Sequence, residues 1–272
     1  AKKESTTIYS LIGHTSSQPK IAYASVLFGN NPQDTFKIAS DLKKQNFKAV
    51  KFGWQNFGLN FSQDQEHLVA AREALGNEIK LMIDVGAIWG TDIEEASKRS
   101  KIFKDNNITW LEEPFYTDAY YEYGQLSTTS NLPLAGGESC HSIESAKNLI
   151  NYGKVKFIQI DAGIAGGILA GNEICNFAEK NNVQYVNHTF TSHLQLSSSI
   201  QPYASSTFSI YAEYPMQLKS LAWDITENHI TKDHNGMINL PLDVGHGMKI
   251  NQKALEQYNV DVEIFVNKKQ LF

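Results

Sequence analysis

The sequence predicts an α/β fold, a closed (β/α)8 barrel of the TIM type, and three observations support this prediction. Eight short runs are rich in β-branched and aromatic residues, and they alternate with segments whose apolar residues recur three and four positions apart. The runs at 79–85 and 155–161 are almost continuously apolar, which is typical of strands covered on both faces. A length of 272 residues is sufficient for one such barrel.

The predicted strands and helices alternate along the chain. The strands are IAYASVLF (21–28), FKAVKF (47–52), IKLMIDV (79–85), ITWLEE (108–113), LPLAGGE (132–138), VKFIQID (155–161), VQYVNH (183–188) and FSIYAE (208–213). Helical periodicity covers 31–45, 64–76, 92–106, 142–153 and 166–181. This alternation predicts strands that run parallel, since each helix returns the chain to the same end of the sheet.

A doubly wound open sheet is the competing architecture. It would place a G-x-G-x-x-G phosphate turn after an early strand, and the sequence contains no such motif. The glycine-rich segment GIAGG at 163–167 follows the sixth predicted strand and has a different spacing. The barrel is therefore the preferred fold.

Three parts of the chain differ in composition. Residues 1–20 are predicted to form an N-terminal tether or linker, and residues 21–215 contain the barrel. Residues 216–272 carry the turn signals DHNG and DVGHG between short apolar stretches, so we expect a C-terminal tail packed on the barrel.

Composition and charge exclude several classes of partner. The formal net charge is −5 and the basic residues are scattered, so neither nucleic acid nor an anionic membrane surface is expected as a partner. The chain has no apolar run long enough for a membrane span and no secretory signal at its start, and we expect a cytoplasmic location. Cys140 and Cys175 are the two cysteines, and both are expected to be reduced thiols.

Titratable residues stand at or near the carboxyl ends of seven predicted strands. They are Lys51, Asp84, Glu112, Glu138, Asp161, His188 and Glu213. In a parallel barrel these ends meet at one mouth, where barrel enzymes place their active sites. A single acid at a strand end can simply cap the next helix, but so many acids together would be costly to bury without a cation or a proton partner.

Three of these acids form a candidate metal site. Asp84, Glu112 and Glu138 lie on three successive strands. Carboxylate oxygens are hard ligands that suit Mg2+, with Mn2+ as the alternative, and we expect one ion per site. The ion would hold the carboxylate of a small-molecule substrate.

The other four residues suit proton transfer and charge balance. Asp161 and His188 come from neighbouring strands, where a carboxylate can orient an imidazole and raise its basicity, so His188 is the candidate general acid or base. Lys51 can offset negative charge, and Glu213 can donate a hydrogen bond if its acidic surroundings keep it protonated.

These residues, in their sequence contexts, resemble the enolase superfamily, within the mandelate racemase/muconate lactonizing enzyme subgroup that contains many acid-sugar dehydratases. The motifs are AVKFGW with Lys51, LMIDVG with Asp84, WLEEP with Glu112 and Glu113, GGES with Glu138, IQIDAGIAGG with Asp161, VNHTF with His188 and AEYP with Glu213. The resemblance covers roughly residues 18–258. As an ordered set the motifs are highly specific, although each alone would be weak.

The resemblance implies a modified (β/α)7β barrel with Mg2+ bound by Asp84, Glu112 and Glu138. It also implies a reaction that removes the proton next to a substrate carboxylate, with the resulting enediolate stabilised on the metal. In acid-sugar dehydratases the histidine of the Asp-His pair, here His188, then helps a neighbouring hydroxyl leave. Glu113 is implied to lie behind the ligands, and members often form homo-oligomers.

The sequence departs from the family pattern on the second strand. The usual K-x-K motif reads Lys51-Phe52-Gly53, so glycine replaces the second lysine, which is a catalytic base in the family. Racemisation by two bases is therefore less expected than dehydration through His188 alone. His193, in the segment TSHL, is the fallback base.

A second departure concerns the α+β capping domain that precedes the barrel in the family. We expect this chain to lack it, because its first residues already read as the linker to the first strand. The leading hypothesis is a Mg2+-dependent lyase that removes water from a sugar acid. The alternatives are a barrel that binds metal or a carboxylate without turnover, or with a separate capping chain, and a racemase or epimerase of 2-hydroxy acids.

Overall fold

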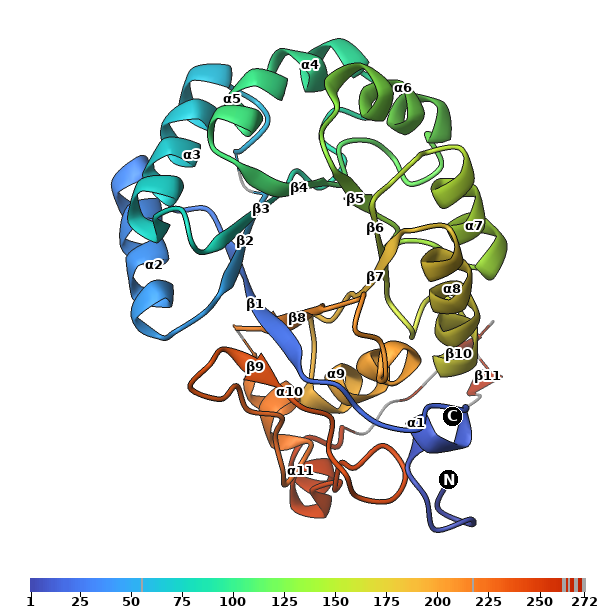
Figure 1. Ribbon diagram of the computed structural model, residues 1–272. Coiled ribbons are helices and arrows are strands. Elements are labelled where there is room, and N and C mark those ends of the chain that lie inside the picture. The colour runs from blue at the N-terminus through green and yellow to red at the C-terminus, as the bar shows by residue number, and fades with distance from the viewer. Residues whose placement is uncertain (55, 217, 261–262, 264, 267–268, 271–272) are drawn as a thin grey trace.

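The computed structural model describes residues 1–272 apart from 55, 217, 261–262, 264, 267–268 and 271–272. In Figure 1, strands β1 to β8 form a ring seen end on, and most of the helices surround it. The strands pair in the order β7-β6-β5-β4-β3-β2-β1-β8, and every pair in this order is parallel. The predicted α/β barrel is therefore confirmed.

Each predicted strand has a counterpart in the structure. The strands are β1 (Lys20–Leu27), β2 (Ala49–Gly53), β3 (Lys80–Asp84), β4 (Ile108–Glu112), β5 (Leu134–Gly136), β6 (Phe157–Ile160), β7 (Gln184–Asn187) and β8 (Tyr211–Pro215). The last strand starts later than predicted because the chain first turns at Ser206, whose hydroxyl oxygen accepts hydrogen bonds from the backbone N–H groups of Phe208 and Ser209.

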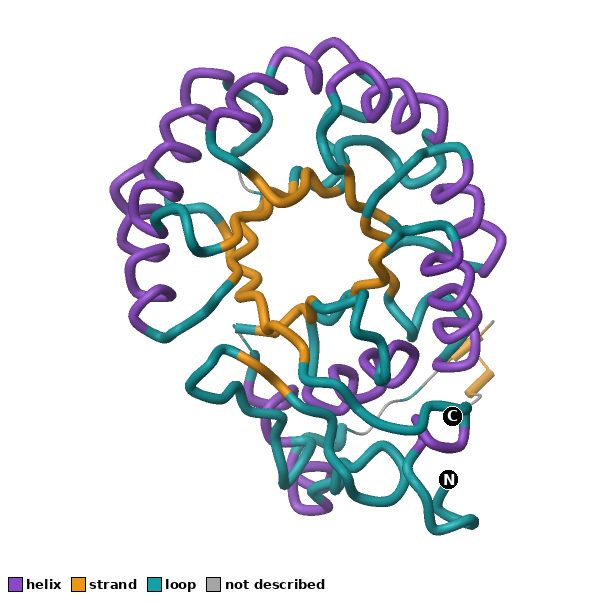
Figure 2. Tube along the Cα trace, in the orientation of Figure 1, coloured by secondary structure: helices purple, strands orange, loops and turns teal. Residues whose placement is uncertain are grey.

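The helices form the outer ring in the tube view of Figure 2. They are α2 (Pro32–Lys44), α3 (Phe61–Leu75), α4 (Ile93–Lys98), α5 (Ser100–Asp105), α6 (Tyr120–Ser130), α7 (Ile143–Asn151), α8 (Ile168–Lys180) and α9 (His193–Ile200), which continues into the 3-10 turn η1 (Gln201–Tyr203). The predicted helix 92–106 is broken into α4 and α5 at Arg99, whose guanidinium turns inward and is buried. Neither α6 nor α9 was among the five predicted helical segments.

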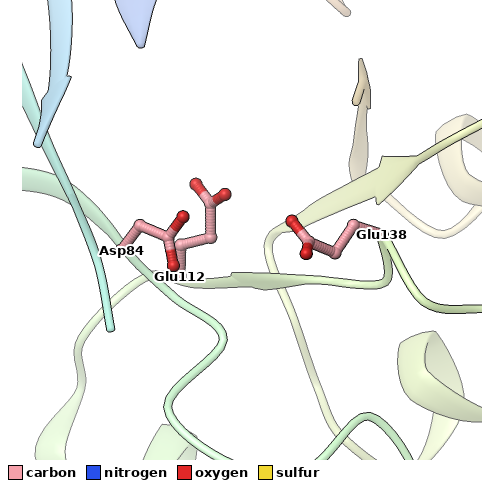
Figure 3. A group of neighbouring side chains, drawn as sticks. All are labelled: Asp84, Glu112 and Glu138. Atoms are coloured by element: carbon pink, nitrogen blue, oxygen red, sulfur yellow. The ribbon is translucent and has the colours of Figure 1, made fainter. Parts of the chain in front are cut away.

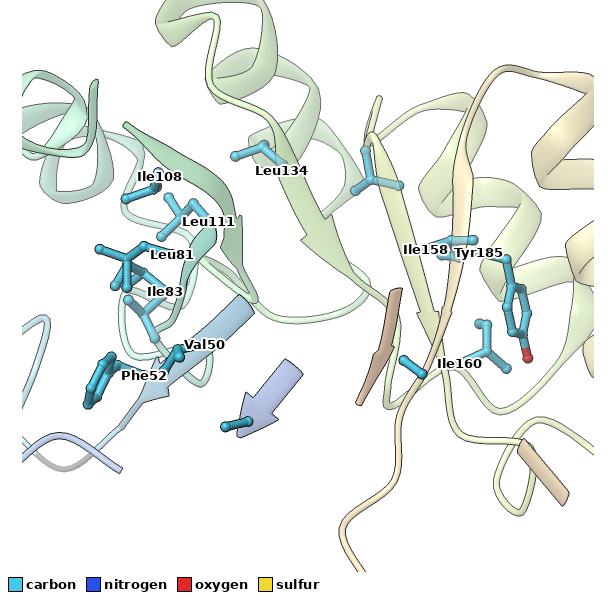
Figure 4. Packing of buried hydrophobic residues seen from close by; sticks show 14 of the residues in the cluster. Val50, Phe52, Leu81, Ile83, Ile108, Leu111, Leu134, Ile158, Ile160 and Tyr185 are labelled. Carbon is cyan, nitrogen blue, oxygen red and sulfur yellow. The ribbon is translucent and has the colours of Figure 1, made fainter. Parts of the chain in front are cut away.

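The core has an outer and an inner part. Outward-facing strand residues pack beneath the helices, and Figure 4 shows part of this cluster, including Val50, Phe52, Ile83 and Ile158. Inward-facing residues fill the barrel itself, where Trp110 is fully buried and contacts the ring of Tyr23 edge on. The centre of the ring in Figure 1 is thus packed with side chains.

Segments that precede and follow the eight barrel strands also pack on the barrel. The predicted tether, residues 1–20, contains the short helix α1 (Ile8–Leu11), and its Tyr9 joins the outer core. The C-terminal segment includes α10 (Ser220–Asp224), β9 (Met237–Ile238), α11 (Gln252–Gln257), β10 (Phe265–Val266) and β11 (Lys269–Gln270). Strand β9 pairs antiparallel with β1, which the sequence did not predict. Within the described residues, no helix has the length and apolar character that crossing a membrane requires.

A buried ion pair holds the loop that follows β2. The Asp64 carboxylate accepts a hydrogen bond from Arg99 Nε at 2.7 Å and another from the Gly58 backbone N–H at 2.8 Å. The Gly58 carbonyl accepts from Arg99 Nη2 and from the Trp89 indole, each at 2.9 Å. Because Gly58 adopts a positive φ of 98°, glycine suits this position better than any other residue.

The Asp64→Asn substitution should lower the free energy of unfolding by about 3–5 kcal/mol, because it removes the buried anionic partner of Arg99 and leaves only the partly exposed Glu95 to pair with it. Urea denaturation followed by circular dichroism measures this change. Asp105→Asn is the matched control, since Asp105 pairs with Lys101 on the exposed surface and should change stability by less than about 1 kcal/mol. Equal losses in the two variants would contradict this role of the buried pair.

Candidate active site

Strand alternation places two layers of side chains inside the barrel. Toward the amino ends of the strands the layer is apolar, with Tyr23, Ala49, Met82, Trp110, Phe157, Val186 and Tyr211. Two residues further along the same strands stand Ser25, Lys51, Asp84, Glu112, Gln159, His188 and Glu213. Residues two apart on a strand point to the same face, so the charged groups stand directly above the apolar layer, at the carboxyl end of the barrel.

The three predicted ligands form one cluster. Asp84 and Glu112 are the last residues of β3 and β4, and Glu138 follows β5 by two residues. Each offers a carboxylate oxygen within 4.8 Å of the other two. Figure 3 shows Asp84 and Glu112 next to each other and Glu138 facing them. The predicted ligand set is therefore brought together in space.

Lys51 is the central cation of this cluster. It lies on β2 and is buried, with Nζ at 2.9 Å from Glu213 Oε1 and 3.5 Å from Asp84 Oδ2. It also forms an ion pair with Glu112. Burial by itself would lower the pKa of Lys51, but the carboxylates of Glu112 and Glu213 raise it well above its ordinary value. Lys51 therefore stays protonated and serves as a counter-charge.

The site carries more negative than positive charge. Its five acids are Asp84, Glu112, Glu138, Asp161 and Glu213, and the cationic groups in contact with them are Lys51 and His188. With all seven ionised, three negative charges remain in excess. Burial raises the pKa of both Glu112 and Glu138, and Asp84 adds to the increase. The residues thus fit a hard divalent cation, which would supply the missing positive charge.

The histidine and aspartate of the predicted pair are in contact. His188 Nδ1 donates to Asp161 Oδ2 at 3.0 Å, and on the other side of the ring Nε2 lies 3.3 Å from Glu138 Oε2. Burial would lower the pKa of His188, but the hydrogen bond to Asp161 and the charges of Glu213 and Glu138 raise it to about 9. The Gln195 amide also donates to Asp161 Oδ2, at 2.8 Å. The imidazole is therefore oriented with Nε2 facing the ligand cluster.

Glu213 is held at the place where the barrel closes. Strands β7 and β8 end the pairing order, and the side chain of Asn187 joins them by accepting from the Glu213 backbone N–H at 3.0 Å and donating to its carbonyl at 3.3 Å. The Glu213 carboxylate accepts from the Thr189 backbone N–H at 2.7 Å. Burial would raise the pKa of Glu213, but Lys51 and then His188 bring it below its ordinary value. Glu213 is thus ionised, contrary to the expectation that it donates a hydrogen bond.

Glu113 directly follows the candidate ligand Glu112 and is buried. Its carboxylate accepts from the Gly137 backbone N–H at 2.6 Å and from the Tyr123 hydroxyl at 3.4 Å. Burial, with the charge of Glu138, raises the pKa of Glu113 to about 8. The side chain ties the end of β4 to the loop after β5, on which Glu138 stands.

His193, the predicted fallback base, is engaged elsewhere. It begins α9 and is buried, and its Nδ1 accepts from the Ile230 backbone N–H at 3.2 Å. Its ring meets Trp223 and His229 edge on, with centroids 5.2 and 5.0 Å away. His193 therefore anchors the C-terminal segment and does not line the pocket that contains His188.

That pocket includes residues that the site prediction did not contain. It is lined by Ser25, Val26, Leu27, Lys51, Gly53, Trp54, Asp84, Glu138, His188, Phe190, Glu213, Pro215 and Met216. The Trp54 indole N–H donates to Asp84 Oδ2 at 3.1 Å, and its ring stacks on Phe190 with centroids 6.1 Å apart. A tryptophan directly after a strand end is a weak signal for a pocket residue. The sequence contains no signal that Gln195 belongs to the site, because only the turn into α9 brings it to Asp161.

Comparison with known proteins agrees with this geometry. The family model described as enolase C-terminal domain-like matches residues 36–254. The chain belongs to this family. The resemblance to the enolase superfamily is therefore confirmed.

The relatives that resemble this chain are named after different activities. D-galactarolactone cycloisomerase of Agrobacterium fabrum is 25% identical over 84% of this chain and 61% of its own length. L-talarate/galactarate dehydratase of Salmonella typhimurium is 35% identical over 52% of this chain and 35% of its own. A crystal structure titled as a predicted mandelate racemase from Rhodobacter sphaeroides shares 39% identity with a TM-score of 0.93, over 99% of this chain and 70% of that one. The chain thus spans about 61% of the length of the cycloisomerase and 35% of the length of the dehydratase.

Proposed function

We propose that the protein is a Mg2+-dependent hydro-lyase that removes water from a sugar acid. The observation that carries the proposal is the convergence of the three carboxylates of Asp84, Glu112 and Glu138 with the Asp161-His188 pair in one mouth. A metal site alone would serve many functions, but an oriented imidazole beside it suits proton transfer next to a metal-bound carboxylate. Similarity to a named dehydratase adds support.

The chemistry divides between the ion and the residues. Bound at the triad, Mg2+ would polarise the substrate carboxylate and so acidify the neighbouring C–H bond. His188 acts in its neutral form, which a divalent cation beside Glu138 would favour by lowering the raised pKa of the imidazole, and Nε2 takes the proton from C2. The C2–H electrons then form the C2=C3 bond while the C3–O bond breaks, and His188 returns the same proton to the leaving hydroxyl, which departs as water. Lys51 lines the pocket and would face the carboxylate oxygens of the substrate, where negative charge increases during the first step.

The racemase alternative is disfavoured by the second strand. Gly53 stands where the family has its second lysine, and a Cβ there would already lie 3.2 Å from Asp84 Cβ. Lys51 is held by three carboxylates and stays charged. Among the described residues that line the pocket, His188 then remains the candidate for proton transfer. A proton would therefore be exchanged from one face of the substrate only.

Asp84→Asn should weaken Mg2+ binding by at least about tenfold, because it replaces an anionic ligand with a neutral amide. Isothermal titration calorimetry with Mg2+ measures the affinity. Glu144→Gln, a substitution of an exposed acid on α7, is the control and should leave the affinity unchanged. Unchanged affinity in Asp84→Asn would mean that the ion binds elsewhere.

His188→Asn should lower kcat for dehydration by about 10²- to 10⁴-fold or more, while Mg2+ affinity stays within about twofold of the wild type. A sugar-acid library screened by mass spectrometry for loss of water supplies the substrate for this test. His234→Asn changes an exposed histidine outside the pocket and should keep full activity. Loss of Mg2+ binding in His188→Asn would contradict this division of roles. Tight Mg2+ binding by the wild type without product from any acid would favour the carboxylate-binding barrel instead.

Hydrogen exchange at C2 should occur with one configuration of a 2-hydroxy acid and not with its mirror image at C2, since proton transfer comes from the His188 side alone. Incubation in D2O, followed by loss of the C2–H signal in proton NMR spectra, measures this. Exchange at comparable rates with both configurations would require a second base and would restore the racemase alternative.

A further inference from the structure

The carboxylate of the candidate ligand Asp84 is held at both of its oxygens by groups of this chain. Oδ1 accepts a hydrogen bond from the Gly86 backbone N–H at 2.9 Å. Oδ2 accepts one from the Trp54 indole N–H at 3.1 Å, and Lys51 Nζ lies farther from it, at 3.5 Å. Lys51 is also shared with two other carboxylates, whereas the single N–H of the indole is directed at Asp84.

The backbone at the end of β2 brings the indole to this position. Gly53 pairs with Asp84 across β2 and β3, and the Trp54 backbone N–H then donates to the Asp84 carbonyl at 3.2 Å. Trp54 leaves the strand with a positive φ of 59°, which is unusual for a bulky residue. Such a conformation persists only where surrounding contacts stabilise it, and the hydrogen bond to Asp84 is one of them.

A glycine allows the indole to approach the loop that follows β3. Gly86 adopts a positive φ of 54°, and a Cβ there would lie 3.2 Å from both Cδ1 and Nε1 of Trp54. A side chain at position 86 would therefore press against the edge of the indole that carries the N–H. The close contact between Trp54, Gly86 and Asp84 thus depends on the residue types at all three positions.

A second candidate ligand is held in the same way. The Trp110 indole N–H donates to Glu112 Oε2 at 2.8 Å. An indole is a donor without charge, so it can fix the orientation of a carboxylate without neutralising it. A carboxylate held by an indole therefore keeps its negative charge and its remaining lone pairs for a cation.

We propose that Trp54 is a positioning residue of the metal site, whose indole N–H orients the Asp84 carboxylate for Mg2+ without neutralising it. This inference rests on the proposed function for the presence of Mg2+ at the triad. Removing a hydrogen-bond partner of a metal ligand typically lowers metal affinity by about 10- to 100-fold, because the ligand is then less well oriented. Trp54 thus raises the affinity for Mg2+ through Asp84.

Trp54→Phe and Trp54→Gln separate the hydrogen bond from the ring. Phe keeps an aromatic ring and lacks the N–H, whereas Gln carries N–H groups on Nε2, the same number of bonds from Cβ as the indole Nε1. Trp54 is 43% exposed, so the barrel should tolerate both substitutions. Titration calorimetry should give about 10- to 100-fold weaker Mg2+ binding for Trp54→Phe and less than about threefold weaker binding for Trp54→Gln.

Phe190→Leu is the control for the aromatic contact. Phe190 stacks on Trp54 with ring centroids 6.1 Å apart and is 60% exposed. The substitution removes the stacking partner and keeps the indole N–H, so the Mg2+ affinity should stay within about twofold of the wild type.

The indole N–H signals in proton-nitrogen correlation NMR spectra give a readout that a merely structural role would not move. The chain has four tryptophans, and the Trp54 signal is the one that disappears in Trp54→Phe. Mg2+ should shift the signals of Trp54 and Trp110, whose acceptors are candidate ligands. It should leave those of Trp89, which donates to a backbone carbonyl, and of Trp223, on α10, nearly unchanged.

Three results would overturn the inference: Mg2+ affinity of Trp54→Phe within about threefold of the wild type, equal losses in Trp54→Phe and Trp54→Gln, or a Trp54 indole signal that Mg2+ does not shift. Failure of the proposed function is a different observation. If the wild type bound Mg2+ and no sugar acid lost water, only the proposed function would fail. If the wild type bound no Mg2+, both would fail.

Discussion

The structure depends on one electrostatic constraint, the gathering of five carboxylates, four of them buried, around Lys51 and His188. An unmatched charge in a low-dielectric interior is very costly, so Lys51, His188 and a divalent cation at the triad would together offset most of the negative charge of this group. The apolar layer below, centred on Trp110, excludes water from the base of the site and strengthens every interaction above it. Trp110 also contributes directly, since its indole N–H donates to Glu112 Oε2 at 2.8 Å. The packed barrel interior and the reactive mouth are therefore two consequences of the same alternation along each strand.

Barrel closure and site geometry are linked at the junction of β7 and β8. The Asn187 side chain supplies hydrogen bonds there that a strand ladder would otherwise make, and its Oδ1 also accepts from the Tyr203 hydroxyl at 2.7 Å. Asn187 directly precedes His188 and binds the backbone of Glu213, so the same amide sets the separation of two site residues. Hydrogen bonds from a side chain can hold two strands at a distance that differs from the fixed spacing of a regular β-ladder.

The sequence was sufficient for the barrel and for the candidate ligands, because both follow from periodicity. Strands recur once per βα unit, and residues at strand ends must meet at one mouth, so Asp84, Glu112 and Glu138 could be placed together before any coordinates were known. Features that depend on tertiary contacts could not be predicted. The ionised state of Glu213 depends on its distance from Lys51. The break between α4 and α5 at Arg99 depends on the contact of Arg99 with Asp64, which lies 35 positions earlier in the sequence.

Pocket and fold are further coupled through the loop after β2. The Asp64-Arg99 pair fixes Gly58, and the same loop carries Trp54, whose indole contacts Asp84. A buried ion pair contributes less to stability than its geometry suggests, because desolvation offsets much of the attraction. Its advantage here is positional, because three hydrogen bonds join Asp64, Arg99 and Gly58 and so fix the backbone of the loop at Gly58. Trp54, which lines the pocket, is thereby held in place by its own contact with Asp84 and by interactions of its loop that lie outside the pocket.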